Sequence, residues 1–306
     1  MIAEFPGLEW WSGEALPAVH RLARETLPFA WANYSFMVNA LLECILLAPL
    51  CAAMGVQIVN FRLAFFSDAI SHSAFTGVAL GLLLHEAATR WGGTFDPRIT
   101  LIGFALVVAF AIAMVRRGTE LSTDTVVGVF FSTVVALGLA IVTASGSRAA
   151  GFQRYLYGDI LTLDAVDLAI TAFLAVLVVV SMCVGFTRWT LIGLNAELAH
   201  SRGVRVRLYD YLFTLLLALV VTVTIRTAGI LLVTGMLLVP AATARNIART
   251  AGGMFRWAVV IGVAGAMTGT LLSFSPRFEG ISSGAMIVLL ASVLFALSLV
   301  LRRLRR

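Results

Sequence analysis

Apolar stretches of about twenty residues recur along almost the whole chain, and short polar segments separate them. An α-helix of about 20 residues rises about 1.5 Å per residue and so crosses the ~30 Å hydrocarbon core of a bilayer. The pattern predicts nine candidate spans, at residues 34–59, 64–85, 97–115, 124–145, 163–187, 208–225, 228–246, 254–275 and 283–301. Only Arg226 and its neighbours separate the sixth span from the seventh, so eight complete crossings and one broken segment are an alternative. The expected fold is an all-α polytopic membrane protein with eight or nine transmembrane helices.

The composition excludes a soluble domain. The chain has 306 residues, of which 60% are hydrophobic and 12% charged, with a mean hydropathy of +0.97. Soluble domains average about 45–50% apolar and about 25% charged residues. Membrane lipid is therefore the expected surrounding of this chain.

The basic residues of the chain are 22 arginines, with no lysine. A nucleotide-binding loop of the G-x-x-x-x-G-K-[ST] type needs its lysine on the phosphates, so the chain cannot hydrolyse ATP by that route. The prediction is a protein that is not an enzyme, with any ATP drive supplied by another chain. The arginines lie in short loops between apolar spans rather than along one soluble face, which argues against a nucleic-acid partner.

The distribution of the arginines predicts the orientation. With nine crossings, fourteen arginines fall on one side of the membrane and eight on the other. The positive-inside rule makes the richer side cytoplasmic, which places the N-terminus outside. The predicted organisation is an extracytoplasmic or interfacial segment at 1–33, one transmembrane domain at 34–301 and a cytoplasmic arginine tail at 302–306.

Two ionisable side chains stand out in the second span. Asp68 and His72 are four residues apart, so they project from one face of the helix. Counted from Arg62 at the cytoplasmic edge, they lie roughly 9 Å and 15 Å into the membrane, where an ionisable group is costly and usually functional. Carboxylate and imidazole together suit Zn²⁺, Mn²⁺ or Fe²⁺. The alternative is a hydrogen-bonded pair that joins helices, and spacing alone does not decide between the two.

The segment around this pair, RLAFFSDAISHSAFTG at 62–77, resembles the signature of the ABC-3 family, the membrane permeases of bacterial zinc, manganese and iron ABC importers. Three further segments agree with that family in order, at 123–128, 157–161 and 229–245. The resemblance runs from about residue 40 to the end. Two departures adjoin the pair, because Ser67 stands where the family has glycine and Thr76 where it has proline.

The resemblance implies a permease of the bacterial plasma membrane with a fold similar to the cobalamin-type (type II) ABC importers. Such a permease pairs with a second copy or a sibling permease, binds cytoplasmic ABC ATPase subunits and receives metal from an extracytoplasmic metal-binding protein. The divalent ion is cargo, and no permanently bound cofactor is expected. The family's intramembrane metal site carries over onto Asp68 and His72.

A basic segment at the end of the seventh span resembles the family's coupling helix, which docks on the ATPase. The residues assigned to it are Pro240, Thr243, Arg245, Asn246 and Arg249. An ordinary charged turn is the alternative.

Two further acidic residues are candidates for the metal path. Glu43, in the first span, is either a pathway residue or the partner of an inward arginine such as Arg226. Asp159, in the outer loop after the fourth span, belongs either to an entry funnel or to a solvated turn.

Two other classes of function were weighed. An ion-gradient-driven metal carrier would use Asp68 and His72 as a proton or metal relay and would have no ATPase partner. An intramembrane enzyme with a catalytic metal would need further ligands at catalytic spacing, which His20 and His85 do not provide.

Overall fold

The computed structural model describes residues 11–26, 33–90, 92–93, 95–144, 163–278 and 281–304, and within them it contains helices and no strand. The all-α prediction is confirmed. The elements are η1 (Trp11–Ala15), α2 (Leu16–Thr26), α3 (Ser35–Phe61), α4 (Ala64–Arg90), α5 (Pro97–Gly118), α6 (Thr123–Ala144), α8 (Ala165–Leu194), α9 (Ala196–Ser201), α10 (Val206–Ile247), α11 (Ala251–Ser273), η3 (Pro276–Phe278) and α12 (Ser283–Leu304).

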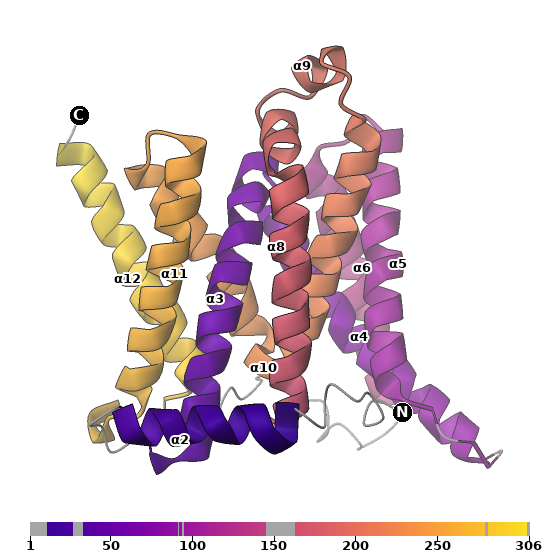
Figure 1. The fold of residues 1–306 in the computed structure, drawn as a ribbon. Coiled ribbons are helices and arrows are strands. Elements are labelled where there is room, and N and C mark those ends of the chain that lie inside the picture. Colours follow the sequence, from indigo (N-terminus) through magenta and orange to yellow (C-terminus); the bar gives the residue numbers. More distant parts are fainter. Residues whose placement is uncertain are drawn as a thin grey trace.

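The long helices stand side by side as one bundle, with α2 lying across one end of it and α9 beyond the other (Figure 1). In the most apolar 18-residue stretch of each helix, 61% of α3 and 67% of α10 is buried, whereas only 22% of α6 and of α12 is buried. The helices α3 and α10 therefore form the centre, and α6 and α12 lie at the periphery. Helix α4 packs against α5, α6 and α10.

Helix α10 contains both the sixth and the seventh predicted spans. Its backbone leaves helical geometry at Gly229, with φ 79° and ψ 163°, a region that is essentially restricted to glycine. Near its start, Asp210 contacts Arg116 at the end of α5, and near its end Arg245 donates to a carbonyl at the end of α3. Both ends of α10 thus lie at one face of the bundle. Its middle lies at the other face, so it crosses twice.

Seven helices of the described residues are each long and apolar enough to cross a membrane, with α10 counted once. Helix α4 has 27 residues but is not among the seven, because its polar side chains, Asp68 and His72 among them, lower its hydropathy. With α4 included and α10 crossing twice, the described helices follow the nine predicted spans. The chain is a multi-pass membrane protein.

The N-terminal elements η1 and α2 are fixed to the starts of two long helices, α8 and α3. The Trp11 indole nitrogen Nε1 donates to the Ala165 carbonyl at 3.0 Å, and His20 Nε2 lies 2.8 Å from Asn39 Oδ1. Because α2 lies across the bundle (Figure 1), it runs along the predicted membrane surface rather than through it. The domain boundary at residues 33 and 34 stays a prediction.

Candidate metal path

The position of the candidate pair depends on the tight turn between α3 and α4. Arg62 ends α3 in the left-handed region, with φ 58° and ψ 41°, and its N–H donates to the Ile58 carbonyl. The Leu63 N–H reaches the same carbonyl at 3.0 Å, and its side chain is buried. Helix α4 can therefore start at Ala64, which places Asp68 in its second turn.

Asp68 and His72 are both half-buried on α4. Among the described residues, Asp68 makes no hydrogen bond and no ion pair, with His72 or with any other side chain. The His72 ring packs edge-on against Phe131 of α6, with ring centroids 5.0 Å apart and planes at 86°. The alternative of a hydrogen-bonded Asp–His pair that joins helices therefore has no counterpart in the structure. Within the described part of the chain, the carboxylate and the ring nitrogens have no hydrogen-bond or ion-pair partner.

The serines beside the pair are committed to their own helix. Ser67 donates to the Ala64 carbonyl at 3.0 Å, Ser71 to the Ser67 carbonyl at 2.8 Å and Ser73 to the Ile70 carbonyl at 2.7 Å. All three side chains are buried. Their hydroxyls therefore satisfy backbone carbonyls and do not extend the ligand set of Asp68 and His72.

Thr76, one of the two departures from the family pattern, joins α4 to α6. Its hydroxyl donates to the Val134 carbonyl at 2.8 Å and is fully buried. Since His72 lies one turn away and contacts Phe131 of the same neighbouring helix, this bond fixes α6 beside the candidate pair.

The pair alone is an incomplete metal site. Zn²⁺ in proteins commonly has four ligands, of which Asp68 and His72 supply two. Within the described part of the chain, no group of three His, Cys, Asp or Glu side chains lies close enough together to hold a metal ion. A metal ion held by Asp68 and His72 would therefore need ligands beyond the His, Cys, Asp and Glu side chains of the described residues.

Glu43 lies in the interior of the bundle, on α3. Its side chain is fully buried, the Thr171 hydroxyl of α8 donates to Oε1 at 3.0 Å, and Oε2 has no hydrogen-bond partner among the described residues. Arg226 does not pair with it, because Arg226 Nη2 lies 2.8 Å from Asp167 Oδ1. Of the two alternatives for Glu43, the pairing with Arg226 is therefore not the one that the structure contains. Asp159 lies outside the described residues.

The five residues assigned to the coupling segment are part of α10. The helix continues through Pro240 to Ile247, so the proline does not end it. Pro240 and Thr243 are buried, Arg245 donates to the Val59 carbonyl at 3.2 Å, and Asn246 donates to Ser298 at 3.0 Å. Arg249 is exposed just beyond the helix. The element that projects from this end of the bundle is α9 (Figure 1).

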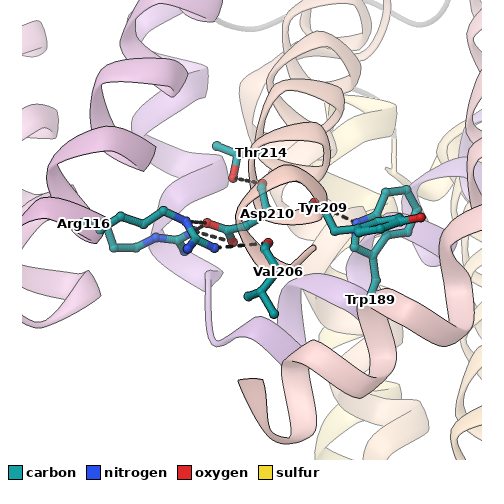
Figure 2. Close-up of polar contacts among 7 residues, drawn as sticks. Arg116, Trp189, Val206, Tyr209, Asp210 and Thr214 are labelled. Carbon is teal, nitrogen blue, oxygen red and sulfur yellow. Dashed lines mark hydrogen bonds and ion pairs between the residues drawn. The ribbon is translucent and has the colours of Figure 1, made fainter. Parts of the chain in front are cut away.

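One buried charge cluster at the arginine-rich end was missed from the sequence. Asp210 is 3% exposed and receives hydrogen bonds from both Arg116 and Arg117 (Figure 2). A signal was available, since Asp210 is the only acidic residue between Glu197 and Glu279 and stands beside an apolar span.

Comparison with known proteins agrees with the observed fold. The sequence profile of the ABC 3 transport family matches residues 33–302. The chain is similar to the high-affinity zinc uptake system membrane protein ZnuB of Haemophilus influenzae, with 31% identity over 267 residues that cover 87% of this chain and 97% of the relative. It is also similar to the manganese transport system membrane protein MntC of Halalkalibacterium halodurans, with 30% identity over 266 residues and 87% coverage of each chain.

Among solved structures, the fold resembles a chain of PsaBC from Streptococcus pneumoniae in complex with Fab. The TM-score is 0.71 at 26% sequence identity, and the match covers 91% of this chain and 94% of that chain. The similarity therefore extends over almost the whole bundle.

Proposed function

Because the chain belongs to the ABC 3 transport family, we propose that it is the membrane-spanning permease subunit of an ABC importer that carries Zn²⁺ or Mn²⁺ inward along a path containing Asp68 and His72. The observation that carries this proposal is the pair itself. A carboxylate and an imidazole that lie half-buried on one face of a transmembrane helix, without a partner among the described residues, are costly unless an ion or a polar path uses them.

The metal follows from the ligand types and from the relatives. Oxygen and nitrogen donors without thiolate accept both Zn²⁺ and Mn²⁺. The two relatives are named for zinc and for manganese, and neither is named for iron. We therefore narrow the cargo to zinc or manganese. Glu43 and Asp159 stay additional candidates for the path, and Asp68 and His72 are the primary ligands.

The incomplete ligand set supports a permease dimer. Asp68 and His72 are half-buried on α4, and His72 contacts α6, a peripheral helix whose most apolar stretch is only 22% buried. A second copy or a sibling permease packed on this side would shield the pair from lipid. It would also supply the further ligands that the described residues of one chain do not provide.

The arginine-rich end of the bundle is the proposed docking face for cytoplasmic ATPase subunits. It presents α9, which projects beyond the other helices, and the exposed Arg245 and Arg249 near the end of α10 (Figure 1). ATP hydrolysis is assigned to those partners. The opposite end, where α2 lies, would receive metal from an extracytoplasmic binding protein, with the chain in the bacterial plasma membrane.

Whole-cell metal content tests the proposal. A deletion strain and its complemented parent are grown under zinc limitation and, separately, under manganese limitation, and cell metal is measured by mass spectrometry. The proposal predicts a deficit of one of the two metals in the deletion strain, restored by the complementing copy. It also predicts the same deficit when the partner ATPase is deleted. Uptake that survives loss of every ATPase partner would support the gradient-driven carrier instead.

A further inference from the structure

The buried cluster around Asp210 ties the start of α10 to the end of α5. Arg116 Nη2 lies 2.6 Å from Asp210 Oδ1 and 2.5 Å from Oδ2, and Arg117 Nε lies 2.8 Å from Oδ2. Arg117 Nη2 also donates to the Val206 carbonyl at 3.3 Å. Figure 2 shows the Arg116 side chain reaching across from its own helix to Asp210.

This cluster differs in kind from a surface ion pair. The side chains of Asp210 and Arg116 are 5% and 13% exposed, whereas Arg90 and Glu86 of the exposed pair on α4 are 74% and 38% exposed. Exposed pairs contribute little to stability, but removing one partner of a buried pair leaves an uncompensated charge and is strongly destabilising. The start of α10 therefore moves together with the end of α5.

A second set of contacts ties the start of α10 to the end of α8. The Trp189 indole nitrogen Nε1 donates to the Tyr209 carbonyl at 2.9 Å, and Trp189 is 3% exposed (Figure 2). Phe213, one turn further along α10, stacks on Phe61 of α3 with ring centroids 4.9 Å apart. The segment that carries α9 lies between the end of α8, at Leu194, and the start of α10, at Val206. The end of α8 and the start of α10, between which α9 lies, are thus fixed to each other.

The series of tight helix contacts continues from α5 to α4, the helix that carries the candidate metal ligands. Helix α5 packs closely on α4, because a Cβ added at Gly77 would lie 2.9 Å from Leu101 Cα and one added at Gly81 would lie 2.8 Å from Pro97 Cα. Asp68 and His72 project from the same α4. A displacement of α9 can therefore reach the pair through α10, α5 and α4 without crossing a loosely packed region.

We propose that Asp210 is a positioning residue of the transport cycle: its bonds to Arg116 and Arg117 transmit displacement of α9 to the helices that carry the metal ligands. This inference rests on the proposed function, in which the ATPase acts on the face that α9 presents. Loss of the carboxylate charge leaves ATP hydrolysis in place but disconnects it from metal movement.

The test measures coupling rather than transport alone. The permease with its ATPase partner is reconstituted in proteoliposomes, and the ratio of metal transported to ATP hydrolysed is measured with radiolabelled zinc or manganese. Substitutions along a coupling path change coupling about 2- to 30-fold, so Asp210→Asn should lower this ratio by that factor while ATP hydrolysis per assembled complex persists. A purely structural role would lower transport and hydrolysis together and leave the ratio unchanged.

Asp167→Asn is the matched control. Asp167 pairs with Arg226 at 2.8 Å and also joins α10 to a neighbouring helix, but at the opposite end of the bundle from α9. The ratio of metal transported to ATP hydrolysed should be the same for Asp167→Asn as for the wild type. If Asp210→Asn does not assemble, the milder Arg117→Gln, which removes one donor from a side chain that is 25% exposed, is measured in the same way.

An unchanged ratio in the assembled Asp210 or Arg117 variant, or an equal fall in the Asp167 variant, would overturn the inference. The proposed function fails separately, through a wild-type complex that transports neither metal in response to ATP.

Discussion

Replacing Gly229 by alanine tests the reversal inside α10, on which the count of membrane crossings depends. Gly229 is buried and holds φ 79° and ψ 163°, between one segment that ends with Arg226 near Asp167 and another that begins the return crossing. A Cβ makes this backbone region strained for any L-residue other than glycine. The substitution therefore acts on the backbone conformation with the smallest possible change of side chain.

The expected cost follows from the backbone angles. A non-glycine residue held in such a region costs about 1–3 kcal/mol. Gly103 on α5 is the matched control, because it is helical and exposed, and a Cβ there would meet no atom within 4 Å. Gly103→Ala should be neutral or stabilise by up to about 1 kcal/mol, since alanine is the better helix former. The two substitutions thus have opposite or very different effects.

The assay is thermal unfolding of the detergent-solubilised protein. The quantity measured at each temperature is the fraction of protein that stays monodisperse after heating. With a shift of about 2–4 °C per kcal/mol, Gly229→Ala should lower the unfolding temperature by about 2–12 °C relative to wild type. Gly103→Ala should stay at or slightly above wild type. Equal unfolding temperatures for the two variants would refute the assignment of a reversal at Gly229, and with it the two crossings of α10.

Two further substitutions probe the surroundings of the candidate path by the same assay. Thr76→Val removes the hydroxyl that donates to the Val134 carbonyl and should cost about 1–3 kcal/mol, because that buried carbonyl loses its donor from α4; an unchanged unfolding temperature would mean that this bond does not hold α6. Glu43→Gln keeps the side-chain size and replaces a buried carboxyl group, one oxygen of which has no partner among the described residues, by a neutral amide, so the unfolding temperature should stay at or rise above wild type. A fall of several degrees would show that the carboxylate has a partner in the working protein.

The spans could be predicted from hydropathy because each needs only its own length of apolar residues. The connection between the sixth and seventh could not, since hydropathy does not register a change of chain direction. Arg226 suggested an interruption, but the reversal depends on the backbone of Gly229 three residues later. The arginine is instead accommodated by Asp167 of α8.

Partnerships between distant residues account for most of what the sequence left open. Arg116 and Asp210 lie 94 positions apart, so no local pattern links them. The segment that resembles a coupling helix is instead part of α10, in which Pro240 is buried and the last turn is tied by Asn246 to α12. The i, i+4 spacing of Asp68 and His72 is local and was sufficient to find the pair. Its remaining ligands are not local and stay unidentified.

Asp68 and His72 are the residues that we propose bind the transported metal. The most direct measurement is ATP-dependent uptake of radiolabelled zinc or manganese into proteoliposomes containing the assembled transporter, for Asp68→Asn and His72→Gln. His85→Gln is the control, because His85 lies on the same helix and donates to the Phe95 carbonyl at 2.6 Å, outside the candidate path. Loss of a ligand should lower uptake about tenfold or more in both path variants and leave the control near wild type. Wild-type uptake by both Asp68→Asn and His72→Gln, at equal amounts of assembled complex, would contradict the account.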